Sequence, residues 1–93
     1  MPIYYKEFRL TLSAYRHGFH DEDFAEMIRG KHLVIRNRRG RQVGYEIFGR
    51  NAAGAYLLAA CRVVRLRRQG VLRVFHLARM SNTDRRRFER SVR

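Results

Sequence analysis

The amino-acid sequence predicts an α+β domain with short N-terminal helices packed on a curved antiparallel β-meander of four or five strands, followed by a basic C-terminal helix. Helical spacing of apolar residues is confined to the part of the chain before residue 31. From residue 31 to residue 80 the chain consists of short β-rich runs, each bounded by turn residues. The links between the runs are too short for crossover helices, so neighbouring runs are expected to pair antiparallel.

The 93 residues give one domain, 1–93, because a chain of this length has room for a single hydrophobic core. One face of the sheet must bury its apolar side chains against the helices. The other face is then left for a ligand.

The N-terminal part begins with an apolar residue at every second position from Phe8, which favours a strand within residues 3–12, although a helix stays open for this segment. Ser13 is a candidate cap for a helical turn that runs to His17. Gly18 supplies the positive φ angle that ends such a turn.

A helix is predicted from Asp21 to Gly30. Its first three residues are all acidic, and the helix macrodipole favours acidic side chains in the first turn. Phe24, Met27 and Ile28 recur at helical spacing, and Gly30 ends the helix.

The rest of the chain is predicted as four strands and a C-terminal helix. The strands are 31–36, 42–50, 55–65 and 71–80, and three hairpin turns lie at 37–40, 51–54 and 67–70. After residue 80, the segment 81–84 offers several helix N-cap residues, and 85–92 is a short, very basic helix or tail.

The charge of the chain predicts a polyanionic partner, which is RNA in the favoured interpretation. Lys and Arg number 21 against 8 Asp and Glu, a formal net charge of +13. Only Lys6 and Lys31 are lysines, so the other 19 basic residues are arginines. A guanidinium binds phosphate or carboxylate through two hydrogen bonds and also stacks on bases. A genome rich in G and C would explain the preference for Arg, but not the net charge.

Several classes of function are disfavoured by residue types. Cys61 is the single cysteine, which excludes an intramolecular disulfide and favours a cytoplasmic protein. It is expected to be a buried, small apolar residue rather than a nucleophile. The four histidines are scattered without the spacing of a metal site, so no metal and no cofactor are expected. No apolar run reaches the length of a membrane span, and the first residues lack the order of a signal peptide.

Cleavage of RNA needs a general base, a general acid and cations that stabilise the pentacovalent phosphate. The candidate proton carriers are His76, His32, His17, Tyr45 and Glu46. His76 is the best of them by residue type, because histidine has an intrinsic pKa near ~6.5.

Strict alternation along 71–80 sorts the residues of the last strand between the two faces. It places Arg73 and Arg79 together on the ligand side, with Phe75, and places His76 among apolar residues on the other side. The favoured interpretation is therefore that His76 is a core histidine, unless a bulge in the strand moves it to the other face.

The strand 42–50 offers a carboxylate and an aromatic ring on one face. Glu46, Phe48 and Arg50 alternate there, so Glu46 is a candidate proton carrier and Phe48, if exposed, a ring on which a base stacks. A salt bridge over a core phenylalanine is the structural alternative. Arg62 is either a buried partner of a carboxylate or a phosphate contact, and Arg85, Arg86 and Arg87 are candidate phosphate contacts or solvated charge.

The order of short motifs over residues 14 to 90 resembles the BrnT-type toxins of the RelE/ParE-like superfamily. The matching pieces are His17-Gly18, Asp21-Glu22-Asp23-Phe24, Phe48-Gly49-Arg50, Gly54 with Leu57-Leu58, Ala78-Arg79 and Arg86-Arg87-Phe88-Glu89. Three positions depart from the pattern. Val43 and Gly44 stand where such chains usually carry Glu and Arg, and Phe88 stands where Tyr is common.

The resemblance implies a type II toxin: a metal-independent endoribonuclease with a microbial-RNase-like fold, which acts on mRNA or other RNA. It also implies an acidic cognate antitoxin and is compatible with association with the ribosome. Arg79 matches the strand-end arginine of the active site in such toxins, and Arg50 follows the matching glycine. With the residue candidates, the catalytic set becomes Arg79, Arg50, Glu46, His76 and Arg62, and the RNA-binding set Arg73, Phe48, Arg85, Arg86 and Arg87.

Two alternatives to a nuclease stay open. The absent Glu-Arg pair favours a noncatalytic RNA- or DNA-binding module on the same fold. A purely structural partner of an acidic protein is the third reading.

Overall fold

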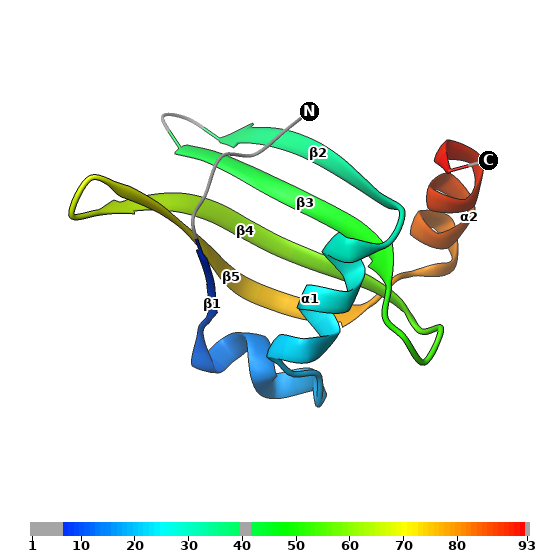
Figure 1. Ribbon diagram of the computed structural model, residues 1–93. Helices are drawn as coiled ribbons and strands as arrows, with labels where there is room; N and C mark the ends of the chain where they lie inside the picture. Colours follow the sequence, from blue (N-terminus) through cyan, green and yellow to red (C-terminus); the bar gives the residue numbers. More distant parts are fainter. Residues whose placement is uncertain (1–6, 40–41, 93) are drawn as a thin grey trace.

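The computed structural model describes residues 7–39 and 42–92, and over these ranges the chain forms an α+β fold with a five-stranded mixed sheet and a C-terminal helix (Figure 1). The elements in chain order are strand β1 (Glu7–Leu10), the 3-10 helix η1 (Leu12–His17), helix α1 (Asp21–Arg29), strands β2 (His32–Arg39), β3 (Gln42–Arg50), β4 (Tyr56–Leu66) and β5 (Gln69–Arg79), and helix α2 (Asn82–Ser91). No helix in these ranges is both long enough and apolar enough to cross a membrane.

The predicted antiparallel meander is confirmed for β2 to β5, which pair antiparallel in chain order. The end of the turn predicted at 37–40 lies outside the described residues, and 37–39 belong to β2. The prediction of a purely antiparallel sheet is wrong at one edge. Strand β1 pairs with β5 in parallel, from Glu7 opposite Val71 to Leu10 opposite Val74. Since η1, α1 and three strands separate β1 from β5 in the chain, no local turn signal reveals this pairing.

The N-terminal helical pieces form where the sequence predicts them. The 3-10 helix η1 ends at Gly18, whose φ angle is +84°. The hydroxyl of Ser13 does not cap this helix but donates a hydrogen bond of 2.9 Å to the carbonyl oxygen of Phe75. The Tyr15 hydroxyl donates to the carboxylate of Asp21 and so links η1 to α1. These contacts fix η1 beside β5.

Helix α1 covers one face of the sheet, as Figure 1 shows. Its Phe24 and Met27 are fully buried. Gly49 of β3 permits this close packing, because a Cβ atom there would lie 3.3 Å from the Cβ of Met27. The helix-covered face supplies most of the core, which combines α1 and η1 side chains with Ile47, Leu57, Ala59, Cys61, Leu72, Val74 and Leu77.

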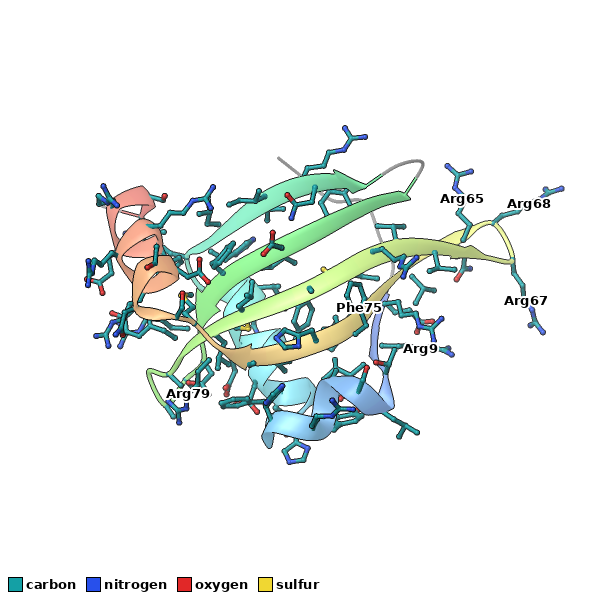
Figure 2. All side chains as sticks on the ribbon, turned by 180° about the vertical axis from the view of Figure 1, so that it is seen from behind. Arg9, Arg65, Arg67, Arg68, Phe75 and Arg79 are labelled. Carbon is teal, nitrogen blue, oxygen red and sulfur yellow. The ribbon has the colours of Figure 1, made fainter. Side chains whose placement is uncertain are left out.

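Helix α2 follows β5 and begins at its cap Ser81, whose hydroxyl accepts a hydrogen bond of 3.1 Å from the backbone N–H of Asp84. Phe88 anchors the helix: it is 3% exposed, and its ring packs edge-on against Tyr56 with 6.0 Å between the ring centroids. The helix lies at one end of the sheet (Figure 1). The face of the sheet opposite α1 is called the outer face. It has no helix over its centre, because α2 lies at one end of the sheet (Figure 2).

Candidate functional site

A β-bulge in β5 decides which side chains reach the outer face. Ala60 lies opposite His76, but the next residue, Cys61, lies opposite Val74, so Phe75 is an extra residue. Residues that pair directly opposite each other share a face, and Ala60 is on the outer face because its neighbours Ala59 and Cys61 point into the core. His76 therefore lies on the outer face.

The same bulge corrects two predictions from strict alternation. His76 does not share a face with core residues Leu72 and Val74, because the extra residue shifts the alternation by one position. Arg79 does not share a face with Arg73 for the same reason: Arg73 lies opposite Arg62 on the outer face, whereas Arg79 lies opposite Leu57 of the core. His76 and Arg79 are still on opposite faces.

Three arginines cross three neighbouring strands in one row on the outer face. Arg73 of β5 lies directly opposite Arg62 of β4 on one side and Arg9 of β1 on the other. All three side chains are exposed. Arg9, Arg73 and Arg62 are called the arginine row.

The arginine row costs stability in the absence of an anion, since like charges directly opposite each other on neighbouring strands repel. At one end of the row Arg9 lies 3.1 Å from Glu7, and both side chains are largely exposed. An exposed pair of this kind contributes little. A phosphate group would relieve the repulsion and accept hydrogen bonds from the guanidinium forks.

A carboxylate and a histidine lie in the next row of the outer face. Glu46 of β3 and His76 of β5 flank Ala60 of β4, because Ala60 is paired with both. Neighbouring strands are ~4.8 Å apart, so the two backbones are about 10 Å apart, with only a methyl group between them. The carboxylate of Glu46 accepts a hydrogen bond from the side-chain amide of Asn37.

His76 has a second histidine beside it. The rings of His17 and His76 meet edge to face, with 5.3 Å between their centroids. His17 is the last residue of η1, and the contacts of η1 with β5 bring it to the edge of the sheet. The pair gives the outer face two imidazoles next to the arginine row.

The exposed ring on this face is Phe75 and not Phe48. Phe48 is 2% exposed, so the expectation that it stacks on a base is wrong, whereas Phe75 is 38% exposed and lies near the centre of the face in Figure 2. The guanidinium of Arg62 lies over the Phe75 ring at 5.5 Å from its centroid. A cation and an aromatic face so arranged are typical of single-strand binding surfaces.

An open depression of about 670 Å³ adjoins the arginine row. Arg9 and Arg73 line it together with the apolar side chains of Val64, Val71 and Leu12. Leu12 is 90% exposed there. The depression thus combines apolar surface with two guanidinium groups, which suits a base attached to a phosphate.

The other predicted residues lie away from this centre. The Arg79 guanidinium lies 5.6 Å from the ring centroid of Phe19, at the helix-covered side of the sheet. The Arg50 guanidinium lies 4.7 Å from the ring centroid of Tyr56, and its Nε donates to the carbonyl oxygen of Gly54 at 3.3 Å. These contacts hold Arg50 near α2.

The basic residues of α2 form a separate group. Arg85 lies 4.1 Å from the centroid of the Tyr56 ring and pairs with Glu89 at 3.0 Å. The hydrogen bond to Glu89 raises the pKa of Arg85, so this group is charged at any physiological pH. Arg86 and Arg87 are exposed on the same helix.

Cys61 is confirmed as a buried apolar residue, with none of its surface exposed. Burial raises the pKa of its thiol to about 12, so it carries no thiolate at neutral pH. Within residues 7–39 and 42–92, no group of three or more His, Cys, Asp or Glu side chains is arranged to hold a metal ion.

Sequence reasoning placed Glu46, Arg62, Arg73 and His76 in the site, and the fold brings these four onto one face. It does not identify Arg9, it gives the role of the exposed ring to Phe48 rather than Phe75, and it gives His17 no partner. Arg9 depends on the parallel pairing of β1 with β5, for which the sequence carries no signal. Comparison with known protein families and with curated proteins found no match to this chain.

Proposed function

We propose that the protein is a metal-independent endoribonuclease of the RelE/BrnT-like type and the toxin of a type II toxin–antitoxin pair. The proposal is supported by the arrangement of side chains on the outer face, where Glu46 and His76 flank Ala60 beside the arginine row. An acid, a base and phosphate-binding cations are what cleavage of RNA through its own 2′-hydroxyl requires.

In the proposed reaction the scissile phosphate lies over Ala60. Glu46 accepts the proton of the 2′-hydroxyl, and the 2′-oxygen attacks phosphorus. The P–O5′ bond breaks as His76, in its protonated form, gives its proton to the leaving 5′-oxygen. The products are a 2′,3′-cyclic phosphate and a 5′-hydroxyl, so atoms and charge balance without a metal.

The arginine row stabilises the reaction electrostatically. Negative charge builds up on the nonbridging phosphate oxygens in the pentacovalent transition state. Arg62 lies two residues along β4 from Ala60, and Arg73 lies three residues along β5 from His76, so both are in the neighbouring row of the outer face. Phe75 and the adjacent depression hold flanking bases. His17 lies against the ring of His76 and orients it for proton transfer.

The cationic outer face also suits an acidic antitoxin. A protein that covers the arginine row with carboxylates would exclude RNA and relieve the repulsion between neighbouring arginines. Ribosome association fits the same charge, since the ribosome presents RNA phosphates.

A second function, a noncatalytic RNA-binding module, is favoured by one observation. Arg79, which the family resemblance assigns to the active site, lies on the other side of the sheet from His76. A binder keeps the arginine row and Phe75 and leaves RNA intact.

Expression in a bacterial host tests the toxin proposal. Induction of the wild-type protein should arrest growth, and co-expression of the small gene beside it should relieve the arrest. His76→Gln should be harmless at the same protein level. Normal growth with soluble, folded wild-type protein would contradict the toxin proposal and favour the noncatalytic module.

A further inference from the structure

The β4–β5 hairpin extends beyond the rest of the sheet. The last described pair between β5 and β1 is Val71 with Glu7, but β4 and β5 continue to pair through Arg65 with Gly70 and Leu66 with Gln69. Both figures show this end as a narrow two-stranded projection (Figures 1 and 2). Residues 65–70 are called the arm.

The arm carries three exposed arginines. Arg65, Arg67 and Arg68 extend from it in different directions in Figure 2. Among the described residues, no side chain forms an ion pair with these three arginines. Its three positive charges therefore face solvent.

The turn of the arm is strained by its own arginines. Arg67 and Arg68 have φ angles of +49° and +65°, in the left-handed region that L-residues with a Cβ rarely adopt. Two-residue hairpin turns with positive φ at both central positions favour Asn-Gly. Arginine at both positions lowers the stability of the turn and places two guanidinium groups at its tip. Such strain is typical of turns that bind a ligand.

The arm lies at a defined distance from the arginine row. Arg67, in the turn that follows β4, is five positions after Arg62, which at ~3.3 Å per residue is about 17 Å. A helical nucleic-acid strand advances ~3.4 Å per nucleotide, so the same length corresponds to about five nucleotides.

We propose that the arm is a second phosphate-binding site for the same RNA strand, about five nucleotides from the outer-face site. The inference rests on the proposed function to the extent that RNA is the ligand of the outer face, and it adds a substrate class. The protein acts on RNA chains of about six or more nucleotides that reach from the arginine row to the arm. Dinucleotides and trinucleotides reach only the outer face.

The test replaces the two arginines at the tip of the arm with the two residues most favoured in a turn of this type. Arg67→Asn/Arg68→Gly removes two charges and introduces Asn-Gly, so the variant should melt at or above the wild-type temperature. The control, Arg16→Gln/Arg29→Gln, removes two exposed charges from η1 and α1, outside the arm and the arginine row. Both variants have the same net charge.

Binding is measured by fluorescence anisotropy as a function of salt, with a fully 2′-O-methylated 12-nucleotide strand and a 2′-O-methylated trinucleotide. These ligands lack the 2′-hydroxyl and cannot be cleaved. For the 12-mer, the arm variant should bind about tenfold more weakly at low salt, and its slope of log K against log salt should fall by about 1.4, the value for two phosphate contacts of a single strand. Its affinity for the trinucleotide should equal that of the control.

The proposal would be overturned if the arm variant and the control lost the same affinity for the 12-mer, or if the arm variant lost the same affinity for the 12-mer and for the trinucleotide. The arm would then be left to an acidic protein partner. The outcome is independent of the nuclease proposal, because it requires no cleavage. A protein that never cuts RNA can still show a 12-mer-specific loss, and an active nuclease can show none.

Discussion

Arg62 and Arg73 lie directly opposite each other on β4 and β5, on the face of the sheet that no helix covers at its centre. Arg9 continues the row on β1. Like charges directly opposite each other on adjacent strands repel, and an anion bound between them would relieve that repulsion.

Arg73→Gln should stabilise the free protein and weaken RNA binding. Removing the central charge relieves repulsion on both sides, which is worth about 0.2 to 1 kcal/mol in the free energy of unfolding. The slope of log K against log salt for single-stranded RNA should fall by about 0.7. Urea unfolding and a salt titration measure the two effects. Arg16→Gln on η1 is the control, and the same slope change in both variants would argue against a specific row.

Phe75→Leu and Phe48→Leu should separate RNA binding from stability. Phe75 is partly exposed, so its replacement should cost less than about 1 kcal/mol of stability but about 1 to 3 kcal/mol of affinity for single-stranded RNA. Phe48 is buried, so its replacement should lower the melting temperature and leave the affinity of the folded protein unchanged. Thermal melts measure the stability of both variants, and fluorescence anisotropy measures their affinity for RNA. An unaltered affinity of Phe75→Leu would show that Phe75 is not part of the site.

Phe88→Ala should loosen α2 from the sheet. The side chain is almost fully buried against Tyr56, and such a truncation costs about 3 kcal/mol of stability. The exposed neighbour Arg87→Ala should change stability by less than about 0.5 kcal/mol. Urea unfolding compares the two, and similar values for both variants would show that Phe88 does not anchor the helix.

Cys61 should resist alkylation in the folded protein. Its thiol is fully buried and its pKa is raised to about 12 from 9.0, so the folded state holds the proton through a pH range in which the unfolded state loses it. The contribution of Cys61 to stability should therefore be complete below about pH 9 and fall as the pH rises toward 12. Iodoacetamide labelling at pH 8, with and without urea, provides the measurement. Rapid labelling without urea would contradict the burial.

The helices and the four strands of the meander could be predicted from the sequence because their signals are local. The acidic start of α1, the stop at Gly18 and the alternation in β3 each act within a few residues. The partner of β1 could not be predicted, because a parallel pairing across most of the chain leaves no local trace.

The candidate site could be predicted in part. Glu46, Arg62 and Arg73 follow from alternation, but the bulge at Phe75 moves His76 from the expected core side to the outer face. A bulge adds one residue without a distinctive sequence, so every residue after it changes face. Alternation assigns Phe48 a face but not what covers it, so the sequence leaves open both a stacking ring and a core phenylalanine, and the structure has the buried ring.

Cleavage of a single-stranded RNA by the purified protein in EDTA is the most direct test of the outer face as a ribonuclease site. The wild type should cut the RNA in EDTA, His76→Gln and Glu46→Gln should lose at least about 100-fold of the rate, and Arg79→Gln should keep most of it. RNA that stays intact with the folded wild type, or cleavage that depends on Arg79 and not on His76, would contradict the account.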